Sequence, residues 1–164
     1  MRFNVKPVVC ISLLTLLLVG FSCNRVNNIY FKYEHIPGEG WSMNNELRYY
    51  PEIADPEKRY DISIELRHNN DYPYQNIYFF VSMLQNDSII GTDTLQYLLA
   101  DETGRWFGRG SNALFQQTLS YKKEYLFPDT GTYQIVVRQA MRDNLLQGVE
   151  DVGIRIEKAL GKGR

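Results

Sequence analysis

The sequence holds few residues of the kinds that perform chemistry in proteins. Its two cysteines, Cys10 and Cys23, both lie within the first 23 residues. The rest of the chain therefore has no thiol for a nucleophile, a disulfide or a cysteine zinc site. Two histidines, His35 and His68, leave little room for a metal cage of imidazoles. We therefore expect no catalytic residue, no bound metal and no cofactor.

The acidic residues do not single out a catalytic pair. A glycoside hydrolase needs two carboxylates that face each other across the sugar. Acidic residues are instead spread between Glu52 and Glu102, and most alternate with apolar residues, as on the solvated face of a strand. His68 could act as a base, but it has no obvious Ser or Cys partner in its polar segment, which favours a solvated surface position.

The stretch Gly104–Gly110, Gly-Arg-Trp-Phe-Gly-Arg-Gly, is the most unusual part of the chain. It lacks the Lys-Ser/Thr ending of a P-loop and is not a dinucleotide fingerprint. Trp and Arg are favoured anchors of protein interfaces, so Arg105, Trp106 and Arg109 form a candidate interaction surface. The alternative is a tight bend in which glycines adopt positive φ and Trp106 plugs the domain. Both interpretations can hold together.

Tyrosines supply the second part of this candidate surface. The chain has 12 Tyr, and a domain of this size cannot bury them all. Tyr72 and Tyr74 flank a proline in a loop-like cluster, and exposed Tyr suits a protein or sugar surface. The alternative is a packed Tyr–Pro loop. We place Tyr72 and Tyr74 on the candidate surface as its second part.

The start of the chain is typical of an export signal. Arg2 and Lys6 precede the apolar run Val8–Val19, which is too short to span a bilayer because a span takes about 20 apolar residues. The run ends in Gly-Phe-Ser-Cys, which resembles a bacterial lipobox, where cleavage precedes a cysteine that carries diacylglycerol. Cys23 is the predicted lipidation site. The alternative is a secreted protein in which Cys23 stays a free thiol.

These features predict the organisation of the chain. We expect a lipoprotein signal peptide at 1–22, a lipid-anchored tether at 23–28, a folded domain at 29–158 and a basic flexible tail at 159–164. A single acyl chain binds a membrane only marginally, whereas the two or three chains of a lipoprotein cysteine hold it stably without a transmembrane helix. We therefore expect the N-terminal lipid anchor to attach the protein to a membrane, which is its first predicted partner.

Composition and periodicity predict the fold of that domain. Hydrophobic residues make up 44% and charged residues 23% of the chain, which is a globular balance. The formal net charge of −1 excludes the concentrated basic surface that nucleic-acid binding needs. Residues 60–67 alternate between apolar and polar, which predicts a strand with one solvated face. Residues 77–84 are apolar on both faces and predict a central strand.

Further short segments complete the pattern. Strands are expected at 29–34, 88–95, 132–138 and 152–157, and helical turns could form at 93–100 and 139–146. Many short strands predict an all-β sandwich of Greek-key topology, immunoglobulin-like or jelly-roll-like. The sequence Asp-Thr-Gly-Thr-Tyr at 129–133 has the spacing of a tyrosine corner, in which the Tyr133 hydroxyl bonds to the backbone upstream. The alternative is a plain turn.

Several blocks of the chain resemble the gliding motility lipoprotein GldH family of Bacteroidetes. They lie at 66–78, 92–95 with 99–100, 104–110, and 138–142 followed by 152–158. The resemblance implies an exported lipoprotein of the gliding machinery, which the same bacteria link to a secretion system. It implies no enzymatic activity and no catalytic residues. Only Cys23 matches a functional position of the family, the lipidation site.

We therefore expect a non-catalytic component or adaptor of the gliding machinery in the cell envelope, with other envelope proteins as partners. Residues 24–28 carry no acidic side chain, unlike the start of lipoproteins that this phylum exports to its surface, so we expect the domain to face the periplasm. The alternative is a glycan- or peptidoglycan-binding sandwich in which Trp106 and exposed tyrosines stack on sugar rings.

Overall fold

The described part of the protein is built from β-strands alone. A computed structural model describes residues 27–111 and 113–160. The predicted signal peptide, Cys23 and positions 161–164 of the predicted tail lie outside the described residues. The strands are β1 (Asn28–His35), β2 (Trp41–Ser42), β3 (Leu47–Tyr49), β4 (Glu52–Ile53), β5 (Tyr60–His68), β6 (Asn76–Gln85), β7 (Ser88–Leu98), β8 (Arg109–Ser111), β9 (Leu114–Tyr125), β10 (Gly131–Gln139), β11 (Leu145–Leu146) and β12 (Val149–Lys158).

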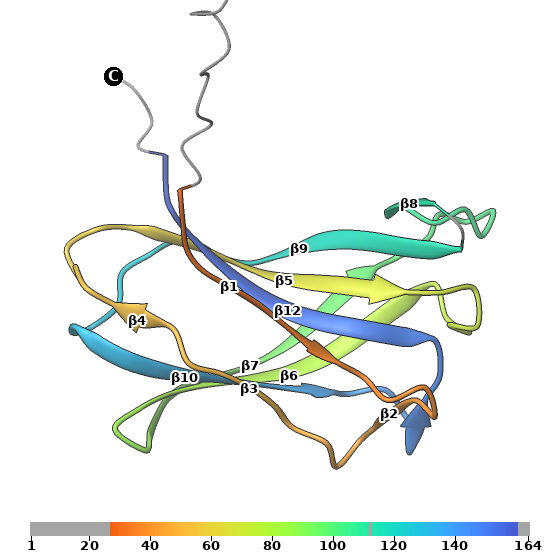
Figure 1. The fold of residues 1–164 in the computed structure, drawn as a ribbon, viewed down its shortest axis with the longest axis horizontal. Helices are drawn as coiled ribbons and strands as arrows, with labels where there is room; N and C mark the ends of the chain where they lie inside the picture. The colour runs from red at the N-terminus through yellow and green to blue at the C-terminus, as the bar shows by residue number, and fades with distance from the viewer. Residues whose placement is uncertain (1–26, 112, 161–164) are drawn as a thin grey trace, which may run out of the picture.

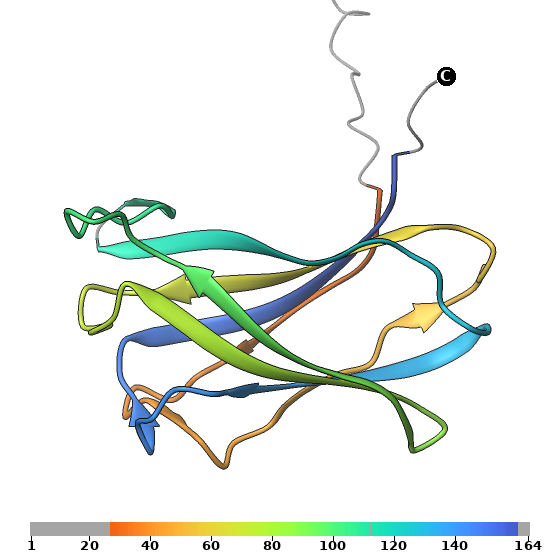
Figure 2. The same ribbon diagram turned by 180° about the vertical axis from the view of Figure 1, so that it is seen from behind.

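Two antiparallel sheets face each other and enclose the core (Figures 1 and 2). The larger sheet has the order β1-β12-β5-β9-β8, and the second has the order β3-β10-β6-β7 with β4 paired to β10. A short pair, β11-β2, lies at one end of the molecule. The predicted all-β, sandwich-like architecture is confirmed, and the Greek-key topology stays a prediction.

The alternating segment at 60–67 forms β5, in the middle of the larger sheet between β12 and β9. Its apolar residues Ile62, Ile64 and Leu66 are fully buried against the second sheet. The other face was predicted to be solvated, and this part of the prediction is wrong. Ser63 and Glu65 are buried as well, because side chains of the neighbouring strands fold over this outer face.

The prediction of a central strand at 77–84 is confirmed by β6, which lies between β10 and β7. Its inward side chains, from Ile77 to Met83, alternate with side chains that face outward. Phe79 and Val81 are fully buried, whereas Phe80 on the outer face is 41% exposed. The apolar outer face of this strand therefore lies at the surface of the second sheet.

The sequence did not reveal β9, the 12-residue strand next to β5. The apolar residues Leu119, Tyr121 and Tyr125 lie at odd positions, as expected for one face of a strand. The polar residues Gln117 and Lys123 occupy the same series of positions and hide the period of two. The segments at 93–100 and 139–146 were expected to have room for helical turns. The first instead lies mostly in β7, and the second runs from the end of β10 through a turn to β11.

The tyrosine corner before β10 is confirmed. The Tyr133 hydroxyl donates to the carbonyl oxygen of Asp129 at 2.8 Å and accepts the Asp129 N–H at 3.0 Å. The fully buried Tyr133 ring packs on Phe127 with 4.6 Å between ring centroids. One hydroxyl thus fixes the turn that leads into β10.

We predict that Tyr133→Phe lowers the free energy of unfolding by about 1 kcal/mol, because the backbone N–H and carbonyl oxygen of Asp129 lose their hydrogen bonds to the Tyr133 hydroxyl. Denaturant unfolding measures the change. Tyr50→Phe is the control, because Tyr50 is 54% exposed and should change stability by less than about 0.5 kcal/mol. Equal losses in the two variants would contradict the role of the corner.

Candidate interaction site

The last residue of β5, His68, lies at the centre of an aromatic cluster. Its imidazole is fully buried, so the expected solvated position is wrong. The ring centroids of Trp106, Phe115 and Tyr72 lie 4.6, 5.5 and 5.6 Å from that of His68. The histidine is buried because the segment after β5 (Tyr72), the bend before β8 (Trp106) and the start of β9 (Phe115) bring these rings over the end of β5.

Burial decides the protonation of this histidine. Removal from water lowers the pKa of His68 below its ordinary value, and the hydrogen bond to Asn69 opposes this effect. Nδ1 lies 3.2 Å from the Asn69 carbonyl oxygen, and Nε2 is buried with no hydrogen-bond partner in the described chain. Burial thus favours the neutral form of the imidazole.

The turn before Trp106 is organised by one carboxylate. Asp101 accepts the backbone N–H of Thr103 at 2.9 Å, the Thr103 hydroxyl at 2.6 Å and the backbone N–H of Arg105 at 3.0 Å. These bonds, the Thr103 hydroxyl foremost, lower the pKa of Asp101 to about 2. Gly104 adopts φ +81°. The tight bend with a positive-φ glycine, predicted for this stretch, is confirmed.

Arg105 and Trp106 lie in this bend, and Tyr74 packs on Tyr72 beside it, with 6.1 Å between ring centroids. The Arg105 side chain is 82% exposed, and its Nε donates to Asp101 at 3.1 Å. Trp106 is half-buried, with its indole N–H directed to Asn70 Oδ1 at 3.3 Å. Tyr74 is 36% exposed and donates to Asp143 at 2.8 Å. The bend thus anchors Trp106 while it presents Arg105.

Tyr72 does not lie on the surface, and its expected exposed position is wrong. Its side chain is only 2% exposed, and its hydroxyl donates to the Asn76 carbonyl oxygen at 2.8 Å. Gly148 makes room for this packing, because a Cβ there would lie 2.2 Å from the Tyr72 backbone nitrogen. Tyr72 supports Trp106 from the interior, at 6.3 Å between ring centroids.

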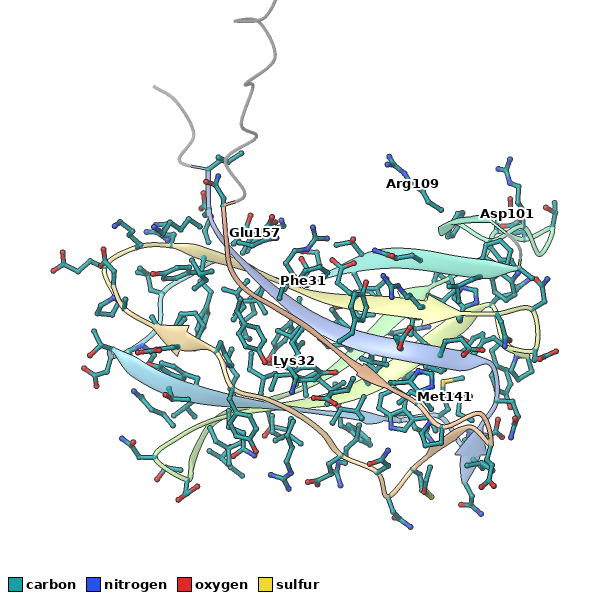
Figure 3. All side chains as sticks on the ribbon, in the orientation of Figure 1. Phe31, Lys32, Asp101, Arg109, Met141 and Glu157 are labelled. Atoms are coloured by element: carbon teal, nitrogen blue, oxygen red, sulfur yellow. The ribbon has the colours of Figure 1, made fainter. Side chains whose placement is uncertain are left out.

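Arg109 belongs to a different surface. It lies in β8 opposite Gln116 of β9, and Figure 3 shows its side chain projecting away from the sandwich. Together with Phe107 and Arg155 it lines an open hollow of about 650 Å³ on the outer side of the larger sheet. The structure therefore divides the predicted interaction surface between the Trp106 bend and this hollow.

The Trp106 bend and the start of the described chain lie at opposite ends of β5. Tyr60, at one end of this strand, pairs with Lys158, whose backbone N–H donates to the Asn27 carbonyl oxygen at 3.2 Å. His68, at the other end, pairs with Phe115 and contacts Trp106. Figure 1 shows the starts of β1 and β5 far from the loop before β8.

The described residues contain no group of three or more His, Cys, Asp or Glu side chains placed to hold a metal ion. Within the same residues, no helix is long and apolar enough to cross a membrane.

Comparison with known proteins places the chain in a family. The model of the GldH lipoprotein family matches residues 28–156. The chain belongs to the GldH lipoprotein family. Within it, the chain is 32% identical to the gliding motility lipoprotein GldH homolog of Christiangramia forsetii over 84% of this chain and 88% of that protein. It is 30% identical to the gliding motility lipoprotein GldH of Flavobacterium johnsoniae over 84% of this chain and 89% of that protein.

Among solved structures, this GldH-family chain is similar to part of a family GH115 4-O-methyl-α-glucuronidase with specificity for decorated arabinogalactans. The match covers 79% of this chain but only 16% of the enzyme, with 13% sequence identity and a TM-score of 0.42. A likeness this weak carries no functional argument.

We predict that the buried His68 makes stability depend on pH. The unfolded chain binds a proton at the ordinary pKa of 6.5, whereas folded His68 binds it only at lower pH. Above pH 6.5, His68 should therefore leave the free energy of unfolding unchanged. As the pH drops below 6.5, the free energy of unfolding should fall, because the unfolded chain binds the proton more readily. His68→Phe should reduce this fall, measured by denaturant unfolding between about pH 7.5 and 5.

The exposed His35 provides the control for this experiment. His35→Gln should keep the fall below pH 6.5 because it leaves the aromatic cluster intact. An equally steep fall in His68→Phe would show that the pH dependence has another source.

Proposed function

We propose that this chain is a lipid-anchored, non-catalytic adaptor of the gliding machinery in the cell envelope. Family membership supports the lipoprotein character, and the names of both curated relatives support the link to gliding motility. The proposal includes a domain that faces the periplasm and a connection to the secretion system that accompanies gliding. The scarcity of thiols and histidines in the sequence supports a role without catalysis.

A short tether would fix which end of the domain faces the membrane. Asn28, the first residue of β1, lies five positions after Cys23 in the chain. Even a fully extended chain covers at most about 3.6 Å per residue, so the start of β1 would lie within about 18 Å of the lipid. The end of the sandwich that carries Asn27, Tyr60 and Lys158 therefore becomes the end next to the membrane.

One observation carries the adaptor proposal: the exposed Trp106 bend lies at the far end of β5 from the tether. A nine-residue strand such as β5 spans about 27 Å. The bend thus extends away from the membrane, where Arg105 and Tyr74 are accessible to envelope proteins. Because the anchor confines the protein to a thin layer, weak contacts would suffice for binding.

The glycan-binding alternative has less support from the geometry of this site. Sugar stacking needs open ring faces, but Trp106 is packed against His68, Tyr72 and Phe115. Tyr72 is buried. An interaction through the exposed Arg105 fits the site better than a stacking platform built on the half-buried Trp106.

The anchor is tested directly by metabolic labelling of growing cells with a clickable palmitate. We predict that the wild-type protein is labelled and fractionates with membranes, and that Cys23→Ala is unlabelled. An unlabelled wild-type protein, with a bare thiol at residue 23 by mass spectrometry, would contradict the proposal.

The docking end is tested by cross-linking of the tethered protein in cells, followed by quantification of gliding proteins recovered with it. We predict that Arg105→Glu lowers their recovery about tenfold or more, as expected for an interface anchor. Arg59→Glu, the same change on an exposed residue near the tether end, is the control and should leave recovery unchanged. Equal recovery with both variants would exclude the Trp106 bend as the docking surface.

A further inference from the structure

The outer face of the larger sheet carries an organised polar surface. Cross-strand partners share a face of a sheet, so the register defines rows of side chains that run from strand to strand. The first row contains Asp151, Arg67, Gln116 and Arg109. The next contains Tyr33, Gly153, Glu65 and Thr118.

Glu65 is fully buried on this outer face. The Thr118 hydroxyl lies 3.0 and 2.9 Å from its two carboxylate oxygens, and Arg155 Nη2 donates to the same carboxylate. The Tyr33 ring lies over Gly153, where a Cβ would be 2.8 Å from Tyr33 Cδ1. The missing side chain at position 153 therefore lets an aromatic ring cover the row that contains Glu65.

Burial of an ion pair costs free energy, because both charges lose their hydration. Here the Glu65–Arg155 pair holds the Arg155 guanidinium in one position. Arg155 uses Nη2 for Glu65 and, at 2.8 Å, for Thr118 Oγ1. Its side chain is 26% exposed. Arg155 is thus held in place with part of its side chain open to the hollow.

The hollow next to Arg155 collects further groups of the same kind. Besides Arg155 it is lined by Phe107, Arg109, Gln116, Gln117 and Thr118. Arg109 is exposed and forms no ion pair with any described residue. Phe107 is 51% exposed at the rim. The hollow therefore combines two guanidinium groups, the Gln116 amide and one apolar ring.

The carboxylates of these two rows already have partners. Glu65 binds Arg155 and Thr118, and Asp151 lies 3.0 Å from His35 and 3.6 Å from Arg67. The residues that line the hollow include two arginines and no acid, so the hollow favours an anion from outside. Guanidinium groups bind carboxylates through paired, charge-assisted hydrogen bonds.

We propose that the hollow binds an acidic segment of a partner polypeptide. A carboxylate of that segment lies between Arg109 and Arg155, and a neighbouring apolar group contacts Phe107. The inference deepens the proposed adaptor function and rests on it for the choice of a polypeptide as the source of the carboxylate. It gives the adaptor a second contact surface, apart from the Trp106 bend. It also implies that the partner is negatively charged where it meets this surface.

The test is a titration of the full-length protein in detergent with a fluorescent hexaglutamate peptide, read by anisotropy. We expect saturable binding that weakens with added salt, and no binding of the matched hexaglutamine peptide. Arg109→Gln should weaken binding about tenfold or more, because one charge-assisted hydrogen bond contributes about that factor. Arg59→Gln is the control: it removes another exposed arginine, at the tether end of the domain, and should leave the affinity unchanged.

Three results would overturn the proposal. The first is no binding of hexaglutamate up to about 1 mM. The second is an equal loss of affinity in Arg109→Gln and Arg59→Gln. The third is tighter binding of polygalacturonate than of the peptide, with the same dependence on Arg109. The last result would assign the hollow to a sugar acid instead of a polypeptide. Each of them leaves the labelling of Cys23 and the Arg105→Glu cross-linking untouched, so a failure here is distinguishable from a failure of the adaptor proposal.

Discussion

The antiparallel pairing of β5 with β12 is the constraint on which the rest of this structure depends. It begins at Tyr60 and Lys158, beside the first described residue of the chain, and ends at His68 and Val149, below the Trp106 bend. The same two strands supply Glu65 and Arg155 to the outer face and Ile64 and Ile154 to the core. One strand pair thus separates the two ends of the domain and positions both of its candidate surfaces.

Polar groups are buried at both surfaces, and in each case they position an arginine or an aromatic side chain. Buried His68 forms the base on which Trp106 packs, and the Asp101 turn then presents Arg105. Buried Glu65 holds Arg155 at the edge of the hollow. Each group loses hydration that the surrounding contacts must offset. Because solubility alone does not require buried polar groups, this repeated arrangement supports a binding role for both surfaces.

Local patterns made much of this fold predictable. The period of two in residues 60–67 and the spacing of residues 129–133 identified β5 and the tyrosine corner, because both depend on neighbours in sequence. β9 was missed since Gln117 and Lys123 break its alternation. The burial of His68, Tyr72 and Glu65 could not be predicted. It depends on Trp106, Gly148 and Tyr33, which come from distant parts of the chain.

The central claim is that the tether holds one end of the domain at the membrane, so that the Trp106 bend is directed away from it. It is tested most directly by electron paramagnetic resonance of the lipidated protein on liposomes that contain a nickel-chelating lipid. The chain has no cysteine after Cys23, so Leu160→Cys near the tether and Glu102→Cys in the bend each accept one spin label. We predict strong relaxation enhancement at position 160 and little at 102; equal enhancement, or the reverse order, would contradict the account.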